Sequence, residues 1–157
     1  MGEDSMIDSA ARRGVPKVGM VCTLMSVTPP CPFVVRNYMY PGTESRYKGT
    51  CTLKAWESVR ATSAAPSMFA EFNNHGLRLS DGGLVANNPT AVAFHEAKHI
   101  WPEILGGDNS ISGIDAIVSM GTGRSPVEPS KTGFMNTIAT LASTVAETST
   151  IDMTLQV

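Results

Sequence analysis

An almost unbroken run of apolar side chains at residues 18–25 is the feature that most constrains the fold of this chain. A strand with one face in water alternates apolar and polar residues, whereas an unbroken run is typical of a strand covered on both faces. The run is far too short to cross a bilayer as a helix, which takes about 20 residues. We therefore predict a buried strand over residues 17–25 and layers of structure on both sides of it.

Helical and extended patterns alternate along the rest of the chain. Helices are expected where apolar residues recur at three- and four-residue spacings, and strands where short apolar runs end at turn residues. The expected helices are residues 5–13, 53–60 continuing to 66, a helix from Asn87 or Asn88 with Pro89 in its first turn, and 134–146; the further strands are 33–37, 77–79 and 114–120. The alternation predicts an α/β fold with a mixed or mostly parallel sheet flanked by helices.

Length, charge and cysteine usage narrow the class of protein. A chain of 157 residues has the length of one domain, and its net charge of −2 offers no basic surface for nucleic acid. Three cysteines without a Cys-x-x-Cys spacing argue against a disulfide framework or a zinc site and favour a reducing compartment. The acidic start, with no apolar segment behind it, predicts no signal peptide. We expect an intracellular protein that touches membranes only peripherally.

One carboxylate is a candidate for chemistry. Asp81 is followed by Gly82 and Gly83, which let the backbone turn sharply and approach a second segment closely. A carboxylate held on such a turn can take the proton of a serine hydroxyl, which is a weak nucleophile until it is deprotonated. Asp-Gly is also among the commonest turn dipeptides, so the dipeptide alone favours an ordinary turn.

A series of motifs in one order changes that interpretation. The chain contains Trp-Glu-Ser-Val-Arg-Ala-Thr-Ser-Ala-Ala-Pro at 56–66, then Phe69, Asp81-Gly82-Gly83, Asn87-Asn88-Pro89 and Ser119-Met120-Gly121-Thr122-Gly123. In order and spacing this series resembles the patatin-like phospholipase family, and within it the calcium-independent phospholipases A2 of the gamma type. The segment Arg36-Asn37-Tyr38, followed by Pro41-Gly42 and Tyr47, adds to the resemblance, which covers nearly the whole chain.

The resemblance implies a serine lipid hydrolase that uses a Ser-Asp dyad and needs no cofactor or metal. It implies that Asp81 is the proton acceptor, with Gly82 and Gly83 completing its motif. In that family the nucleophile lies in Gly-x-Ser-x-Gly, which occurs nowhere in this chain, so no nucleophile is assigned. Residues 1–157 are accordingly expected to be the C-terminal portion of a single patatin-like domain, incomplete at its N-terminal side and inactive by itself.

The implied substrate is a fatty acyl ester of a phospholipid or another acyl lipid, so the implied process is lipid degradation. Head group, acyl position and the choice between phospholipid and triglyceride stay open, as does the oligomeric state. The alternative is a non-catalytic isoform that binds lipid or regulates a catalytic partner.

Other side chains offer weaker candidates. His95 and His99 lie one helical turn apart in His-Glu-Ala-Lys-His, as zinc ligands do, but no third ligand clusters with them and an ordinary helix face is favoured. Ser80 is adjacent to Asp81, and neighbouring strand residues point to opposite faces. Ser63 is expected to pack or to cap a helix, and Cys22 to be a small buried residue.

Overall fold

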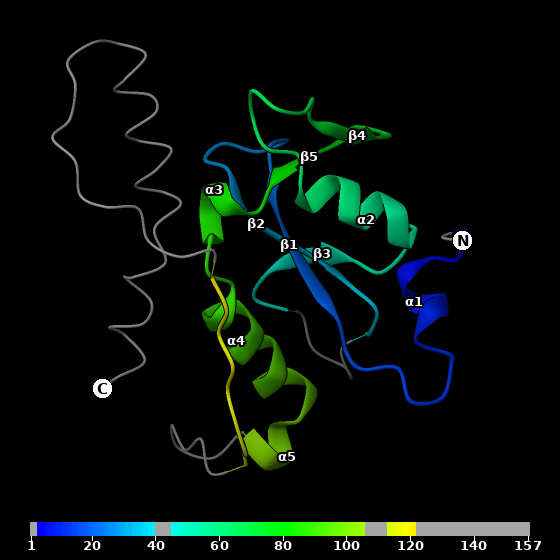
Figure 1. Cartoon of the computed structure of the whole chain (residues 1–157), viewed down its shortest axis with the longest axis vertical. Helices are drawn as coiled ribbons and strands as arrows, with labels where there is room; N and C mark the ends of the chain where they lie inside the picture. Colours follow the sequence, from blue (N-terminus) through cyan, green and yellow to red (C-terminus); the bar gives the residue numbers. More distant parts are fainter. Residues whose placement is uncertain (1–2, 40–44, 106–112, 122–157) are drawn as a thin grey trace, which may run out of the picture.

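The computed structural model describes residues 3–39, 45–105 and 113–121 (Figure 1). The elements are α1 (Met6–Ser9), β1 (Gly19–Leu24), β2 (Cys31–Arg36), β3 (Lys48–Thr50), α2 (Ala55–Thr62), β4 (Phe72–Asn74), β5 (Leu77–Asp81), α3 (Gly83–Ala86), α4 (Thr90–Ile100) and α5 (Pro102–Leu105). The helix expected over 134–146 lies outside the described residues. Within them, no helix is long and apolar enough to cross a bilayer.

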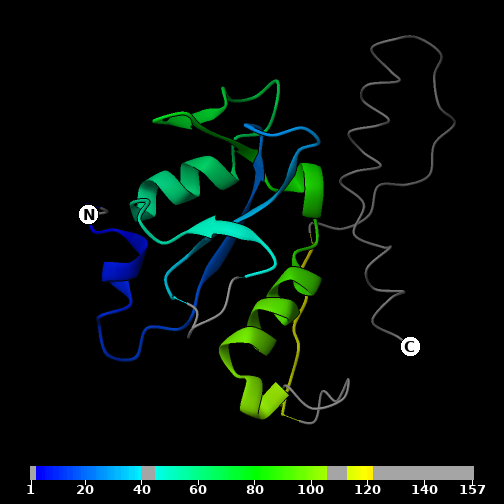
Figure 2. The same ribbon diagram turned by 180° about the vertical axis from the view of Figure 1, so that it is seen from behind.

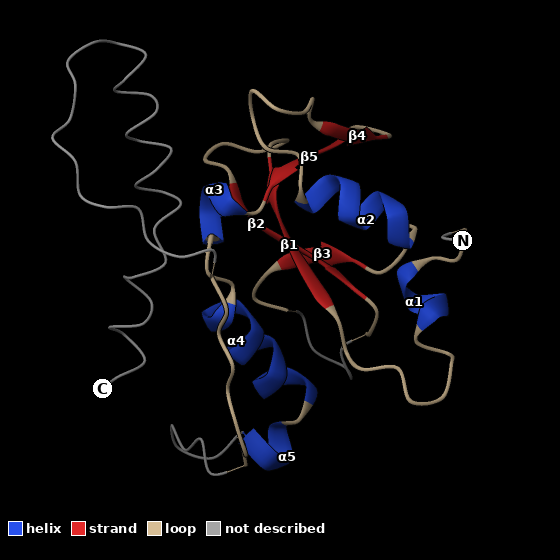
Figure 3. Ribbon diagram, viewed as in Figure 1, coloured by secondary structure: helices blue, strands red, loops and turns tan. Residues whose placement is uncertain are grey.

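Five strands form one mixed sheet in the order β3-β2-β1-β5-β4 (Figure 3). β1 pairs antiparallel with β2 and with β5, β4 pairs antiparallel with β5, and only β2 and β3 run parallel. The α/β class and the mixed sheet are confirmed, with antiparallel pairs in the majority. The short connection between β1 and β2 explains this, because a parallel neighbour needs a crossover of a dozen residues or more.

β1 lies at the centre of the sheet and has structure on both of its faces, as the unbroken apolar run predicted. Cys22 and Leu24 join a core beneath α1 and α2 whose other buried members are Met6, Phe33, Val35, Leu53, Ala61 and Leu79. The alternate residues Gly19 and Val21 face α4 across a small cavity of about 190 Å³. Figures 1 and 2 show α2 and α4 lying against different parts of the sheet.

Several elements differ in extent from the sequence-based expectation. α1 is only one turn long, although Ser5 and Asp8 form the capping box that starts it. α4 begins at Thr90, because residues 83–86 form the separate helix α3 and the Asn88 side chain accepts a hydrogen bond from the Thr90 amide at 3.0 Å. The β4–β5 hairpin was not predicted; its turn at His75 and Gly76 has φ values of 48° and 87°, a left-handed pair that glycine favours.

The strand predicted over residues 114–120 is wrong. Among the described residues the segment pairs with no strand, and it runs beside α4 with Val118 79% and Met120 90% exposed. An apolar, β-branched sequence favours an extended backbone, but a strand also needs a neighbour with unpaired N–H and C=O groups. A helix offers no such neighbour along its length, because its own backbone groups are bonded internally.

Candidate functional site

Asp81 is the last residue of β5 and lies opposite Cys22 of β1. Its amide donates to the Ala64 carbonyl at 3.0 Å, and its carbonyl accepts from the Thr23 hydroxyl at 2.6 Å. Hydrogen bonds to Thr23 of β1 and to Ala64 in the turn after α2 therefore hold the Asp81 backbone on both sides. Such anchoring fixes the direction in which the side chain leaves the sheet.

The Asp81 carboxylate is half-buried and partly engaged. Its Oδ1 atom accepts a hydrogen bond from the Gly83 amide at 2.6 Å. Within the described part of the chain no donor is bonded to Oδ2, so this oxygen keeps the capacity to accept a proton. One oxygen thus orients the carboxylate, and the other has the arrangement that a candidate general base requires.

The two glycines after Asp81 are required by close contacts. A Cβ atom at Gly82 would collide with the Val21 carbonyl of β1. A Cβ atom at Gly83 would lie 2.9 Å from Asp81 Oδ1 and 3.3 Å from Asn87 Oδ1. Gly82 has a φ of −64° and Gly83 begins α3, so neither adopts a left-handed backbone. Glycine is needed at both positions because a side chain would have no room.

Two threonines complete this turn, and the sequence analysis did not identify either one as functional. Thr23 is fully buried and holds the Asp81 carbonyl, as described above. The Thr62 hydroxyl donates to the Val21 carbonyl at 2.5 Å, and the Thr62 carbonyl accepts from the Gly82 amide at 3.4 Å. Thr23 could have been noticed in the sequence because it is a hydroxyl residue within the apolar run of β1. Thr62 could have been noticed because it lies inside the motif at 56–66.

Cys22 faces Asp81 across the β1–β5 pair but is a poor nucleophile. Burial is the main reason why the pKa of its thiol is raised from 9.0 to about 12. A hydrogen bond with Thr62 acts to lower this pKa, and the negative charge of Asp81 acts to raise it. A thiol with such a pKa stays protonated at neutral pH and is chemically inert. The expectation of a small buried residue is confirmed.

The candidate serines are occupied with backbone groups. Ser80 is buried, and its hydroxyl donates to the Ala64 carbonyl at 2.8 Å. The Ser63 hydroxyl donates to the Val59 carbonyl at 2.8 Å, near the end of α2. Neither hydroxyl is bonded to the Asp81 carboxylate, so this structure pairs the candidate base with no serine among the described residues.

His95 and His99 both lie on α4, and within the described residues no third candidate metal ligand joins them. The His95 and His99 rings stand 4.4 Å apart, and His99 Nδ1 lies 2.9 Å from the His95 carbonyl oxygen. Burial lowers the pKa of His95, and the nearby His99, Arg46 and Lys98 lower it further. In the described ranges, no three His, Cys, Asp or Glu side chains form a group that could hold a metal.

Glu96, which lies between these histidines, has a structural role. Glu96 is 3% exposed and forms an ion pair with Arg36 of β2, whose Nε lies 2.6 Å from Oε2. The Tyr38 hydroxyl donates to the same oxygen at 2.8 Å. This buried pair joins α4 to the sheet, and the sequence analysis missed it because the partners are 60 residues apart.

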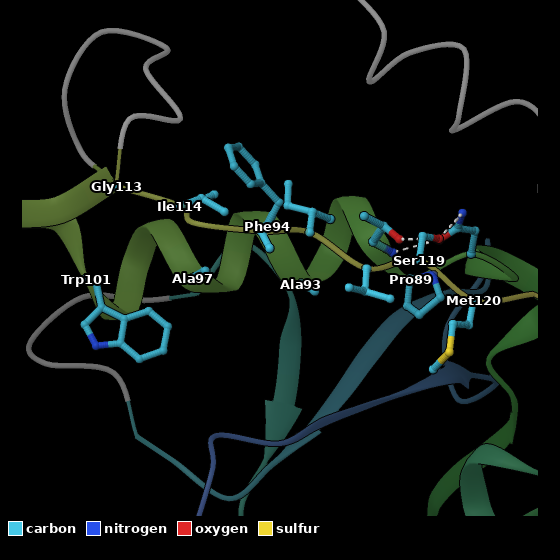
Figure 4. A pocket seen from close by; sticks show the side chains of 14 residues that line it. Pro89, Ala93, Phe94, Ala97, Trp101, Gly113, Ile114, Ser119 and Met120 are labelled. Atoms are coloured by element: carbon cyan, nitrogen blue, oxygen red, sulfur yellow. Dashed lines mark hydrogen bonds between the residues drawn. The ribbon is translucent and has the colours of Figure 1, made fainter.

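A largely apolar cavity of about 600 Å³ lies between α4 and residues 113–120 (Figure 4). Phe94, Ala97 and Trp101 line it from α4 and its end, and Ile114 and Val118 line it from the extended segment. Figure 4 shows the Ser119 side chain hydrogen-bonded at one end of the cavity. These bonds come from Asn88 Nδ2 at 3.3 Å and from the Thr90 hydroxyl at 3.2 Å.

The cavity suits an aliphatic chain in size and lining. The motif Asn87-Asn88-Pro89 connects it to the turn of Asp81, because Asn87 ends α3 beside Gly83 and Asn88 lines the cavity. A candidate base and an apolar cavity are therefore linked by a few residues of chain.

Nearly the whole chain is similar to calcium-independent phospholipases A2. It is 39% identical to calcium-independent phospholipase A2-gamma of Mus musculus over 96% of its own length, which is 19% of the mouse protein. It is 35% identical to phospholipase A I of Arabidopsis thaliana over 83% of its length, and 35% identical to "Probable inactive patatin-like protein 9" of the same plant over 45%. The chain thus spans about a fifth of the mouse relative. No family model and no solved structure matches it significantly.

Proposed function

Because this chain is a homologue of calcium-independent phospholipase A2-gamma and of plant patatin-like phospholipases, we propose that it is part of a serine lipid acyl hydrolase. The substrate class is a fatty acyl ester of a phospholipid. The observation that carries the proposal is the setting of Asp81, whose backbone is anchored to two elements and whose Oδ1 is oriented by Gly83. The protein would meet its substrate at an intracellular membrane surface.

In the proposed reaction Asp81 acts as the general base of a Ser-Asp dyad. Asp81 Oδ2 accepts the proton of a serine hydroxyl as the serine oxygen attacks the ester carbonyl carbon. The ester C–O bond breaks, the lysolipid leaves with that proton, and the acyl group stays on the serine. Asp81 then deprotonates a water molecule whose oxygen attacks the acyl carbon. The bond from that carbon to the serine oxygen breaks, the fatty acid leaves, and Asp81 returns the proton to the serine. The serine and the oxyanion hole belong to a part of the enzyme outside these 157 residues, which contain no Gly-x-Ser-x-Gly.

A chimera tests the role of Asp81. The aligned segment of the mouse phospholipase A2-gamma is replaced by this chain, and fatty acid release from phosphatidylcholine is measured. The chimera should hydrolyse the lipid, and Asp81→Asn should lower the rate by a factor of 100 or more, on the order of a lost general base. Asp115→Asn is the matched control, because Asp115 is an exposed carboxylate outside the site. Full activity of the Asp81→Asn chimera would show that the assigned base is wrong.

The chain by itself should release no fatty acid, because it contains neither the nucleophile motif nor the oxyanion loop. Robust hydrolysis by the purified 157-residue chain would contradict this part of the proposal. The same preparation addresses a second candidate function, a lipid-binding or regulatory protein without catalysis. That candidate is favoured by the absence of Gly-x-Ser-x-Gly and by a relative named as an inactive patatin-like protein. A folded chain that binds lipid vesicles but stays inactive in every chimera would support it.

A further inference from the structure

The turn that carries Asp81 is held by the hydroxyl groups of two threonines that lie on different elements. Thr23 belongs to β1, and Thr62 is the last residue of α2. Thr23 is 0% exposed, so its hydroxyl has no solvent to bond with. A buried hydroxyl costs free energy unless it forms a hydrogen bond, so the partner of this hydroxyl explains why it is there.

Strand pairing alone holds Asp81 only weakly. β5 ends at Asp81, and the pair that Asp81 forms with Cys22 lies at one end of the β1–β5 ladder. The next residue, Gly82, has already left the strand and has a φ of −64° and a ψ of −23°. The end of an element opens more readily than its middle. The position of the carboxylate therefore depends on bonds that other groups add to the ladder.

Thr23 supplies one of these bonds from the central strand. Its Oγ1 atom donates to the Asp81 carbonyl oxygen at 2.6 Å. Threonine is branched at Cβ and its χ1 angle is stiff, so a buried threonine hydroxyl points in one fixed direction. The carbonyl carbon of Asp81 is bonded to the Cα atom that bears the carboxylate side chain. Fixing this carbonyl, together with the bond from the Asp81 amide to Ala64, fixes the point from which the side chain starts.

Thr62 holds the following residue with two of its groups. Its carbonyl accepts a hydrogen bond from the Gly82 amide at 3.4 Å, and its hydroxyl donates to the Val21 carbonyl at 2.5 Å. Gly82 packs directly on this Val21 carbonyl, since a Cβ atom at Gly82 would collide with it. Thr62 therefore fixes both the peptide group of Gly82 and the surface on which Gly82 packs.

The geometry of a general base is sensitive to small movements of this turn. Gly83 directly follows Gly82, and its amide donates to Asp81 Oδ1 at 2.6 Å. A shift at Gly82 moves that donor, and a shift at the Asp81 carbonyl moves the carboxylate itself. A general base must lie about 2.6–3.2 Å from the atom whose proton it takes, and a misplacement of about 1 Å can lower a rate about 100-fold. The two hydroxyls thus control a distance on which the rate depends strongly.

We propose that Thr23 and Thr62 are positioning residues for the candidate general base, an inference that rests on the proposed role of Asp81. Neither hydroxyl gives or takes a proton in the reaction. Thr23 acts through the Asp81 carbonyl, and Thr62 acts through Gly82 and the Val21 carbonyl. Together they hold Asp81 Oδ2 where it meets the proton of the serine nucleophile.

Kinetics of the chimera with the mouse phospholipase A2-gamma test this role. Thr23→Val should lower kcat for phosphatidylcholine about tenfold and leave KM unchanged, because lipid binding does not depend on the position of the base. Thr62→Val should act in the same direction. Thr23→Ser and Thr62→Ser should restore most of the rate, because serine keeps the donor.

Ser58→Ala is the matched control. Ser58 is also 0% exposed, but its hydroxyl donates to the Lys54 carbonyl at 2.9 Å, at the start of its own helix. Rates are divided by the folded fraction from circular dichroism, so that a loss of folded enzyme is not counted as a loss of kcat. An unchanged kcat in Thr23→Val, or an equal loss in Ser58→Ala, would overturn the proposal.

A double-mutant cycle separates positioning from a general effect on the fold. A residue that acts only through the Asp81 carboxylate loses its influence once that carboxylate is gone. In the Asp81→Asn chimera, Thr23→Val should therefore lower the remaining rate by less than about twofold. A further loss of about tenfold in this background would show that Thr23 acts by another route, against the proposal.

Failure of this inference and failure of the proposed function give different results. Full activity of the Asp81→Asn chimera refutes the assigned base. A slow Asp81→Asn chimera with a fully active Thr23→Val chimera refutes the positioning role alone.

If every chimera is inactive, amide hydrogen exchange of the 157-residue chain decides. The Gly83 amide should exchange at least about tenfold faster in Thr23→Val than in Ser58→Ala, because the turn that bonds it to Asp81 Oδ1 has lost an anchor. Equal exchange in the two variants would overturn the proposal.

Discussion

Loss of one partner of the buried Arg36–Glu96 ion pair should lower the stability of the fold strongly. The two side chains are 7% and 4% exposed, so neither charge has water as an alternative partner. Glu96 accepts hydrogen bonds from Arg36 Nε at 2.6 Å, Arg36 Nη2 at 2.9 Å and the Tyr38 hydroxyl at 2.8 Å. Arg36 Nη2 also donates to the Tyr47 carbonyl at 2.9 Å, so β2, α4 and the segment before β3 meet at one guanidinium.

Glu96→Ala removes the acceptors of these hydrogen bonds and the negative charge that lies 2.6 Å from the buried Arg36 Nε. Removing one member of a buried pair costs about 3–5 kcal/mol, whereas a whole small domain is stable by only about 5–15 kcal/mol. We therefore expect the free energy of unfolding to fall by about 3–5 kcal/mol. Urea unfolding followed by far-UV circular dichroism measures this difference, provided that the slope with urea stays the same.

A double variant separates the charge from the packing. Arg36→Met with Glu96→Leu removes both charges and keeps most of the volume, and replacing a whole buried pair in this way is often neutral or stabilising. We expect the double variant to be much more stable than Glu96→Ala. If Glu96→Ala loses less than about 1 kcal/mol, in the range of an exposed ion pair, the argument that this pair joins α4 to the sheet is refuted.

Two further predictions concern the turn of Asp81. Thr23→Val should destabilise the protein by about 1–3 kcal/mol in urea unfolding, because the Asp81 carbonyl loses its donor at 2.6 Å in a buried site, while Thr23→Ser should keep most of the stability. A Thr23→Val variant as stable as the unmodified chain would refute this role of the hydroxyl. Because burial raises the pKa of the folded Cys22 thiol from 9.0 to about 12, the folded state holds a proton that the unfolded state loses, and stability should fall as pH rises from 9.0 towards 12. Cys22→Ala should lack this part of the alkaline loss, and an unchanged pH dependence would contradict the assignment.

Elements with a strong local pattern could be predicted from the sequence. The apolar run gave β1, and the recurring apolar spacing gave α2 to within two residues at its start. β3 was missed because its three residues, Lys48, Gly49 and Thr50, have no apolar pattern and form a strand only beside β2. The segment 114–120 shows the opposite error: its composition predicts a strand, but it pairs with no strand among the described residues.

The candidate base could be found from the motif order, but its surroundings could not. Asp81, Gly82 and Gly83 are adjacent in the chain, so their pattern is readable. Thr23 is 58 residues away from Asp81, and nothing in its own neighbourhood indicates that its hydroxyl holds the Asp81 carbonyl. The same holds for Glu96. In the sequence it lies within His-Glu-Ala-Lys-His, a spacing typical of metal ligands, whereas in the structure it forms an ion pair with Arg36.

The sequence by itself determined the central strand, the class of fold, the turn after Asp81 and the resemblance to lipid hydrolases. Each of these depends on residues that are neighbours along the chain or on the order of motifs. Only the tertiary structure decided the antiparallel pairing of β1, the hydrogen bond that orients Asp81 Oδ1 and the burial of Glu96 with Arg36. The physical reason is that periodicity is local, whereas pairing, burial and charge neutralisation depend on segments that only folding brings together.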